Sequence, residues 1–422
     1  MNIGSYVHQI RRFSGLIGWT AIDQILFALS NLAVTLAVAR GGGADALGRY
    51  SVAFAAYLIV LGCSRALVSE PLLALPQRDD VSSAEAKSNT LTLLCAIAGA
   101  LIVAVVGLIL GRVELLVIAV ALPPALAQDI LRYQAFRRQK PAMAALLDAS
   151  WLVASLATWR LVTTAGSTTV ALLCWTGGAL LSIGIGWRAL RPRLSGARVA
   201  ISWWRQEARC LANPLLLDGI IYIVSGQALV FVVASMVGDD QLGVLRAGQV
   251  YFAPLGLLLT ALGVLAVPHL AQRPKATTGV VAVRIAAAAS LFAAIICGGI
   301  LAAQPLLHSL LYGNSIAVPK FLLVPLAIQV VLTGAAAGPA VVTRARRRGA
   351  DMARSRLTAA IVGVGLLIWA TATFGVIGAA WALAGQTLWY TAHLGLRVKH
   401  AGAPGEDTYG QKKGDTVAQR SS

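Results

Sequence analysis

Charged residues are scarce in this chain: they make up 12% of its 422 residues, whereas 58% are hydrophobic. A soluble domain of that size and balance would expose a large apolar surface to water. A transmembrane helix takes about 20 apolar residues, so about twelve such helices would account for most of the chain. We therefore expect an all-α polytopic membrane protein with little room for a soluble domain.

Cysteine and histidine are also rare, with five residues of each. None of them lies in the paired spacing of a zinc site, an HExxH motif or a disulfide framework. The sequence therefore predicts no metal, no cofactor and no disulfide-stabilised domain.

Acidic residues are few as well, at 17 against 35 Lys and Arg, which gives a formal net charge of +18. Strongly basic proteins often bind the phosphates of nucleic acids. Here, however, the basic residues lie in short blocks between apolar runs, which is the pattern that sets membrane orientation. We therefore predict no nucleic-acid partner.

The apolar runs form two groups of six predicted spans. They cover about residues 15–39, 48–69, 89–111, 115–131, 142–160 and 168–187, then 213–237, 244–268, 280–303, 320–342, 356–374 and 376–396. With both termini in the cytoplasm, 28 of the 35 basic residues lie inside, six including Arg246 lie outside, and Arg65 lies within a span. This bias follows the positive-inside rule and predicts a multi-pass protein of the cytoplasmic (inner) cell membrane.

The polar stretches define the expected domains. They are an N-terminal six-helix lobe at 1–187, a cytoplasmic amphipathic linker helix at 188–212, a C-terminal six-helix lobe at 213–397 and a disordered basic cytoplasmic tail at 398–422. The linker pattern places arginines on one helical face and apolar residues on another. We expect Trp203 and Trp204 of this linker at the level of the lipid headgroups.

An internal repeat relates the two groups of spans. Residues 22–53 align without gaps with residues 217–248 at a constant offset of 195, and ten pairs are identical. The pairs include Asp23 with Asp218 and a shared Gly-x-Asp-x-Leu-Gly turn. Because each half holds an even number of spans, the repeat is parallel, as in transporters whose two lobes rock about a site between them.

An Ala-Arg pair ends the first span, the turn that follows leads into Leu-Gly-Arg-Tyr-Ser, and the second half echoes this pattern. These features resemble the polysaccharide and lipid-linked oligosaccharide flippases of the multidrug/oligosaccharidyl-lipid/polysaccharide (MOP, MATE-like) exporter superfamily, most strongly over residues 15–75 and 213–272. The resemblance implies two parallel six-helix lobes around a polar cavity that moves a polyprenyl-(pyro)phosphate-linked glycan between leaflets. Membrane lipids and glycan-assembly enzymes are the further partners that it suggests.

A charge at the centre of a bilayer costs about 2.5 to 3.5 kcal/mol, so an intramembrane charge should face a cavity or a partner. Arg65 lies toward the cytoplasmic end of the second span, where its guanidinium could bind the pyrophosphate of a lipid-linked substrate. The alternative is an arginine that snorkels to the interface or pairs with Glu70.

Three aspartates are candidates for ion coupling or gating. Asp23 and Asp218 lie about two turns into the first helix of each lobe, where they could bind H⁺ or Na⁺, close the cytoplasmic side by pairing with a basic residue, or only support the lobe. Asp148 has no evident partner nearby in the sequence, which makes it the better coupling candidate. Asp129 and Arg132, three residues apart, are most simply a structural pair.

Three functions remain open at this point. The first is flipping of a lipid-linked glycan by alternating access, and the second is ion-coupled export of small molecules within the same superfamily. The third is a membrane glycosyltransferase or glycan polymerase. Because such enzymes need a sizeable outer loop with catalytic acids or bases, which this sequence lacks, we expect a transporter and not an enzyme.

Overall fold

The computed structural model of this chain is built from helices, and its described part contains no strand. It describes the backbone of residues 3–75, 81–256, 278–346 and 348–400, with short pieces at 258–259, 266–267 and 270. Side chains are described from residue 18 onward, except at 81, 210–218, 220, 222, 224, 278 and 400. The predicted tail therefore lies almost wholly outside the described residues.

The helices follow one another with short connections. They are α1 (Ile3–Ser64), the π-helical turn η1 (Arg65–Ser69), α2 (Glu70–Ala74), α3 (Val81–Leu110), α4 (Val113–Arg137), α5 (Pro141–Ala157), α6 (Trp159–Ala165), α7 (Thr168–Leu190), α8 (Ala197–Trp203), the π-helical turn η2 (Trp204–Ala208), α9 (Arg209–Val250), α11 (Thr278–Ala302), α12 (Gln304–Leu311), α13 (Lys320–Ala345) and α14 (Gly349–His400).

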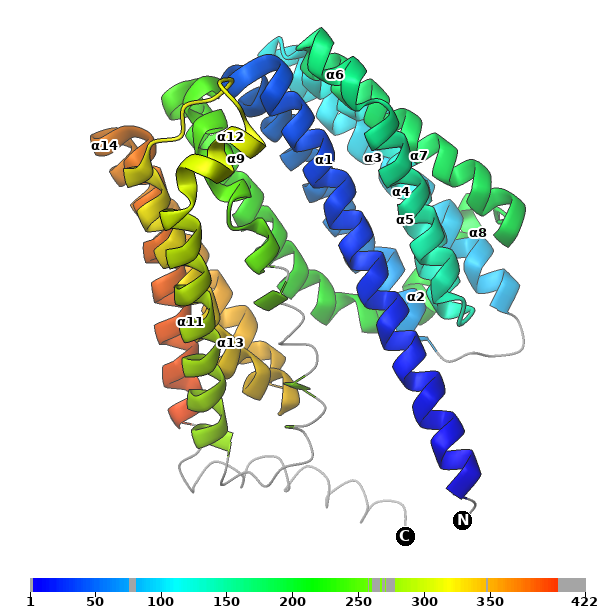
Figure 1. Cartoon of the computed structure of the whole chain (residues 1–422). Helices are drawn as coiled ribbons and strands as arrows, with labels where there is room; N and C mark the ends of the chain where they lie inside the picture. The colour runs from blue at the N-terminus through cyan, green and yellow to red at the C-terminus, as the bar shows by residue number, and fades with distance from the viewer. Residues whose placement is uncertain are drawn as a thin grey trace.

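These helices form two bundles that lean against each other (Figure 1). The N-terminal bundle comprises α1 to α7, in which α4 packs against α3 and α7 and α5 packs against α1. The C-terminal bundle comprises α9 and α11 to α14, and α1 and α9 pack against each other between the two bundles. The start of α1 and the end of α14 lie at the same end of the molecule, at the bottom of Figure 1. The exact domain boundaries stay predictions.

Eight of the described helices are long and apolar enough to cross a membrane, or nine if α5 and α6, bent by 44° at their junction, form one span. Two of the eight, Gly18–Ala74 and Gly349–Lys399, are 57 and 51 residues long. Each bends at a glycine, Gly43 or Gly375, and has enough residues for two crossings. The multi-span fold is confirmed, whereas the total of twelve stays a prediction.

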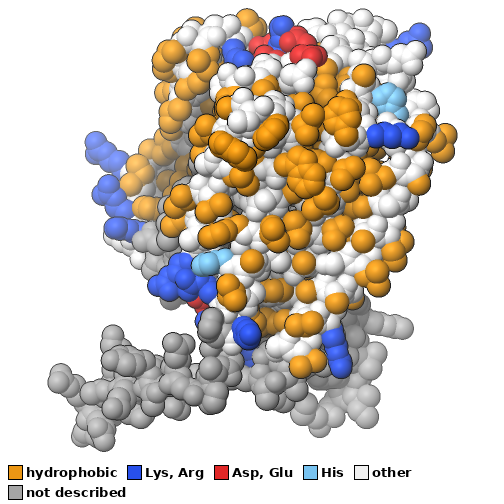
Figure 2. Space-filling model, turned by 90° about the vertical axis from the view of Figure 1, so that its left-hand side faces the viewer, with side chains coloured by type: hydrophobic (Ala, Val, Ile, Leu, Met, Phe, Trp, Pro, Cys, Tyr) orange, Lys and Arg blue, Asp and Glu red, His pale blue; other side chains and the backbone are white. Residues whose placement is uncertain are grey.

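The outer faces of the bundles are apolar. Side chains of α3 and α11 such as Ile109, Leu101 and Val283 are 77%, 63% and 68% exposed, as expected where lipid replaces water. Figure 2 shows hydrophobic side chains spread over the middle of the face on the side of the C-terminal bundle. The low charge content of the sequence is thus explained by the large lipid-facing surface, which consists of apolar side chains.

The internal repeat has a direct counterpart in the backbone. α1 bends at Gly43, with φ of 70°, and α9 bends at Gly238, with φ of 84°. These two glycines are partners at the offset of 195 residues. A positive φ is costly for a residue with a Cβ. Glycine at both positions therefore allows the backbone to leave one helical segment and enter the next. We call the end of the molecule that carries these bends the outer end.

Just beyond the bends, the two bundles meet at a symmetric contact. A Cβ added at Gly48 would overlap the carbonyl oxygen of Asp239, and a Cβ added at Gly243 would overlap the carbonyl oxygen of Ala44. Residues 44 and 239, like 48 and 243, are repeat partners, so the two contacts are equivalent. Only glycine permits this backbone approach. We refer to these two contacts as the outer seam.

The linker between the bundles packs its two tryptophans against the N-terminal bundle. Trp203 is buried at 3% exposure in a cluster with Val68 and Leu72, and Trp204 donates a hydrogen bond from Nε1 to the carbonyl oxygen of Leu67 at 2.9 Å. The depth of the two tryptophans in the membrane stays a prediction. Their rings fix the linker to the N-terminal bundle, where burial of large aromatic surfaces is more favourable than exposure at the interface.

Candidate functional site

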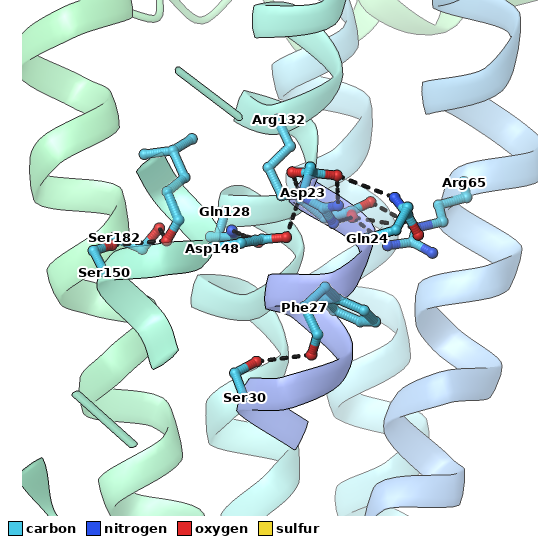
Figure 3. A network of polar contacts seen from close by, with 12 residues as sticks. Asp23, Gln24, Phe27, Ser30, Arg65, Gln128, Arg132, Asp148, Ser150 and Ser182 are labelled. Carbon is cyan, nitrogen blue, oxygen red and sulfur yellow. Dashed lines mark hydrogen bonds and ion pairs between the residues drawn. The ribbon is translucent and has the colours of Figure 1, made fainter. Parts of the chain in front are cut away.

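Four buried charged side chains of the N-terminal bundle, Asp23, Asp129, Arg132 and Asp148, lie in one network with Arg65 (Figure 3). Its centre is an ion pair between Asp23 of α1 and Arg132 of α4, which are 0% and 2% exposed. Arg132 donates from Nη2 to Asp23 Oδ2 at 2.5 Å and from Nε to Asp23 Oδ1 at 3.2 Å. Two hydrogen bonds in one plane make this a bidentate pair, the strong form of an arginine–carboxylate contact.

A second bidentate pair joins Arg65 to Asp129. Arg65, the first residue of η1, donates from Nη2 to Asp129 Oδ1 at 2.6 Å and from Nε to Asp129 Oδ2 at 3.0 Å. Asp129 Oδ1 also accepts from Arg132 Nη1 at 3.2 Å, which links the two pairs. π-helical turns are uncommon and recur at functional sites, because the extra residue redirects a side chain.

Asp148 of α5 completes the network but is held less tightly. Its Oδ1 accepts a hydrogen bond from Gln128 Nε2 at 2.8 Å. Its Oδ2 lies 3.1 Å from Arg132 Nε yet accepts no hydrogen bond, because the Nε–H of Arg132 is directed at Asp23. Asp148 is 1% exposed, so one oxygen of this carboxylate is buried with only a charge contact to stabilise it.

Aromatic rings cover the two guanidinium groups. The ring of Phe27 lies 5.2 Å from the guanidinium carbon of Arg132 and 5.7 Å from that of Arg65. The ring of Tyr133 lies 5.9 Å from that of Arg65. Such cation–π contacts stabilise the arginines and shield the ion pairs from lipid and water.

The network carries unequal charge. With every group ionised, the three carboxylates of Asp23, Asp129 and Asp148 face only the two guanidiniums of Arg65 and Arg132. An excess negative charge in a low-dielectric interior is costly, and uptake of a proton or a monovalent cation would relieve it. No group of three His, Cys, Asp or Glu side chains that could hold a metal occurs within the described residues.

The structure places the predicted site residues as follows. It joins Asp23, Asp148 and Arg65 in this network, whereas the side chain of Asp218 lies outside the described residues. Neither sequence-based alternative for Arg65 foresaw its partner, since Asp129 is 64 residues away in the chain.

The sequence reasoning missed Gln128 and the central role of Arg132. Their only local signal is their closeness to Asp129 in α4: Gln128 precedes it directly, and Arg132 follows it by three residues. Asp129 and Arg132 do form the expected pair, at 3.2 Å, but as part of a larger network.

The C-terminal bundle contains a cation of a different kind. Arg246 lies eight residues beyond Gly238, or about 12 Å along α9, and is half-buried. The sequence count assigned Arg246 to the outer side of the membrane, and the structure places it within the continuous helix α9. Its Nη1 donates to Gln249 Oε1 at 2.9 Å, and no acidic side chain of the described residues forms an ion pair with it. Because Arg246 follows Gly243 by three residues, it lies on the face of α9 that meets the N-terminal bundle.

At the outer end, polar contacts reinforce the seam between the bundles. Arg112 pairs with Asp239 at 2.9 Å. Arg40 donates from Nε to the carbonyl oxygen of Leu311 at 2.8 Å and from Nη2 to that of Leu310. These two carbonyls end α12, where the helix dipole favours a positive charge. The outer ends are therefore closed against each other.

The network lies at the opposite end of α1. Asp23 is twenty residues before the bend at Gly43, a helical distance of about 30 Å, which is close to the thickness of a hydrocarbon core. The described residues thus place a closed contact at the outer end and the buried charges near the predicted cytoplasmic end.

Comparison with known proteins identifies this architecture. No family model matches the sequence and no curated protein matches it. Solved structures do match: the lipid II flippase MurJ in an inward closed conformation is 12% identical, with a TM-score of 0.69 over 90% of this chain and 87% of that one. The fold is that of MurJ and the MATE transporters. The resemblance to the MOP superfamily is thereby confirmed at the level of the fold.

Two MATE family transporters match as well. An inward-facing MATE family transporter of the MOP superfamily is 14% identical, with a TM-score of 0.69 over 89% of this chain and 94% of that one. An outward-facing conformation of a MATE family transporter is 13% identical, with a TM-score of 0.53 over 93% and 95%.

Proposed function

We propose that this chain is a flippase that moves a polyprenyl-(pyro)phosphate-linked glycan across the cytoplasmic membrane by alternating access. Two of the matched structures are a lipid II flippase and a multidrug resistance transporter. Both activities are compatible with the fold, so the substrate has to be argued from side chains.

The observation that carries the flippase proposal is Arg246. A half-buried guanidinium in a membrane helix is unfavourable unless a partner is present for part of the transport cycle. Its position one turn inward of the outer seam, on the face toward the other bundle, suits a substrate that enters from the inside. A phosphate or pyrophosphate would supply the missing negative charge through charge-assisted hydrogen bonds.

Arg65 is the weaker phosphate ligand. Asp129 already occupies two of its donors, and 26% of its side chain is exposed. A phosphate could reach the remaining donors only beside a carboxylate that repels it. We therefore assign Arg65 to the organisation of the network and Arg246 to the anionic linker of the substrate.

The test is leaflet accessibility of a fluorescent polyprenyl-pyrophosphate-linked sugar in proteoliposomes. Wild type should expose the label faster than empty vesicles do. Arg246→Gln should slow this exposure at least about tenfold, which corresponds to the loss of about 1.4 kcal/mol of interaction, and Arg246→Lys should retain part of the rate. Arg354→Gln, which removes an exposed arginine of α14, is the matched control and should behave as wild type.

Two outcomes would contradict this assignment. Wild-type vesicles that are no faster than empty vesicles would refute flipping of this substrate. Arg246→Gln at the wild-type rate would refute the role of this arginine even if flipping occurs.

Ion-coupled export of small molecules is the second candidate, and the net negative charge of the network favours it. In this proposal Asp148 takes up H⁺ or Na⁺, because one of its oxygens accepts no hydrogen bond, and Asp23 gates the inner end through Arg132. Asp218 remains a candidate of the same kind. Asp148→Asn should then abolish transport driven by a proton or sodium gradient, while Arg246→Gln should leave it unchanged. Transferase activity of the purified protein would instead revive the enzyme hypothesis.

A further inference from the structure

The linker presents a basic surface that neither bundle covers. Between residues 187 and 209 the sequence holds six arginines and one acidic residue, Glu207. All six arginines are exposed: Arg188, Arg191, Arg193, Arg198, Arg205 and Arg209. Large apolar side chains lie exposed among them, with Trp187 at 55%, Leu194 at 60% and Val199 at 51%. A surface that mixes arginines with exposed apolar groups is typical of segments at the headgroup level of a membrane.

The linker is held in place from its opposite side. Asn89 of α3 donates from Nδ2 to the carbonyl oxygen of Arg193 at 2.9 Å. Thr90 exchanges hydrogen bonds with Ser195, from its Oγ1 to the carbonyl oxygen at 3.0 Å and from the Ser195 amide to its Oγ1 at 2.9 Å. The arginines therefore sit on a fixed backbone, which reduces the entropy lost when they bind a ligand.

We propose that this surface binds the phosphate headgroups of anionic phospholipids in the cytoplasmic leaflet. Guanidinium groups recognise phosphate oxygens with a planar fork of donors, and each basic residue near an anionic surface adds about 1 kcal/mol. The exposed Trp187, Leu194 and Val199 supply the apolar contact that a soluble phosphate would not need. The partner is therefore a lipid in the bilayer, and the proposal does not depend on the transported substrate.

One hydrogen bond within the protein connects this lipid-binding surface to the candidate site. Trp204, next to Arg205, donates to the carbonyl oxygen of Leu67 inside η1. η1 begins at Arg65, which holds Asp129 of the ion network. Lipid on the arginine face should accordingly slow backbone exchange in η1 by lowering the mobility of the linker.

The binding test uses the purified full chain in a zwitterionic detergent with added phosphatidylglycerol or phosphatidylcholine, and native mass spectrometry to count bound lipid. Wild type should retain phosphatidylglycerol in preference to phosphatidylcholine. The double variant Arg198→Gln/Arg205→Gln should bind phosphatidylglycerol about 30-fold more weakly, or about fivefold for each arginine. The pair Arg284→Gln/Arg354→Gln removes the same charge from exposed positions of the C-terminal bundle and should bind as wild type.

Three results would overturn the proposal. They are equal retention of both lipids by wild type, an equal loss in the control pair, and unchanged binding in the linker variant. Should Arg198→Gln/Arg205→Gln fail to fold, Arg188→Gln/Arg193→Gln provides a second pair on the same surface, with the same expected loss. In wild type, hydrogen–deuterium exchange of the peptide that contains η1 should slow with phosphatidylglycerol and not with phosphatidylcholine, and exchange that is equal with both lipids would refute the link to the network.

Discussion

The two bundles share a backbone plan but differ in their charges. Gly43 and Gly238 bend α1 and α9 alike, and Gly48 and Gly243 make equivalent contacts across the seam. By contrast, the N-terminal bundle joins five charged side chains in one network, four of them buried. The charge that we highlight in the C-terminal bundle, Arg246, has no acidic partner within the described residues. The two copies of the repeat thus share the glycines at the bends and at the seam, whereas the charged side chains described above differ between the bundles.

The repeat partners of the charged positions illustrate this specialisation. Arg246 corresponds to Ser51, which is buried and donates from Oγ to the carbonyl oxygen of Leu47. A serine hydroxyl can donate its hydrogen bond to a carbonyl oxygen of its own helix, whereas a guanidinium has too many donors for this. The two repeats therefore differ by one charge at this position, and the following predictions probe this asymmetry.

The largest effect should come from the centre of the network. Arg132→Met keeps an unbranched side chain but leaves three carboxylates facing only Arg65, and loss of one partner of a buried ion pair costs about 3–5 kcal/mol. We expect a corresponding loss in the free energy of unfolding in detergent, measured by denaturant titration. Asp23→Asn in the Arg132→Met background should recover part of the loss, because it removes one of the uncompensated charges. A loss below about 1 kcal/mol for Arg132→Met would show that the network is not a stabilising core.

The next largest effect should come from the outer seam. Gly243→Ala places a Cβ against the carbonyl oxygen of Ala44, and overpacking of this kind costs about 1–3 kcal/mol. The bundles should separate at the outer end, so a cysteine at Leu47 should react at least about fivefold faster with an impermeant maleimide, in a background without the native cysteines. Leu47 is fully buried and lies on the same helical face as Ala44.

Gly226→Ala is the matched control for the seam, because nothing lies within 4 Å of a Cβ at that position of α9. It should leave the labelling rate unchanged. Equal rates in Gly226→Ala and Gly243→Ala would mean that the seam does not control opening.

A smaller effect should follow from loss of the ion pair between the bundles. The side chains of Arg112 and Asp239 are 29% and 17% exposed, and a pair this accessible contributes about 0.2–1 kcal/mol. Arg112→Gln should therefore raise the labelling rate at Leu47→Cys by at most about fivefold, and high salt should reduce the difference. Arg160→Gln removes an exposed arginine of α6 that forms no ion pair within the described residues, and it should have no effect on labelling. A rise of the same size in both variants would contradict the role of Arg112 as a contact between bundles.

The smallest effect on stability should come from Arg246. Its removal breaks one hydrogen bond to Gln249 and relieves an unpaired charge, so Arg246→Gln should change the free energy of unfolding by no more than about 0.5 kcal/mol. Denaturant titration of Arg246→Gln and Arg132→Met under the same conditions compares their free energies of unfolding. A loss of several kcal/mol would show that Arg246 has a structural partner and would weaken its assignment to the substrate.

The fold was largely predictable from the sequence. Membrane solubility follows from composition, and the repeat at an offset of 195 residues predicted a parallel two-lobe architecture that the MurJ-like and MATE-like fold confirms. Gly43, Gly48 and their partners carried much of this signal, because a backbone bend or close approach requires glycine. The packing of Trp203 with Val68 and Leu72 was not predicted, since these residues lie more than 130 positions apart in the chain.

The candidate site was predictable only in part. Asp23, Asp148 and Arg65 stand out as charges in apolar runs, and each of them does lie in the network. Their partners are not visible in the sequence, because Arg132 lies 109 residues from Asp23 and Asp129 lies 64 residues from Arg65. Arg246 was counted in an outer loop, because hydropathy does not locate a helix bend to within one or two turns.

By itself, the sequence determined that the chain belongs in a membrane, that it contains a repeat, and that both copies of the repeat carry a Gly-x-Asp-x-Leu-Gly turn. These properties depend on composition and on local backbone geometry, which a linear pattern records. Only the tertiary structure decided that Asp129 holds Arg65, that Asp23 and Asp148 share Arg132, and that Arg246 is left without an acid within the described residues. The energy of a buried charge depends on which groups packing brings within a few ångströms of it, and helices far apart in the chain supply those groups.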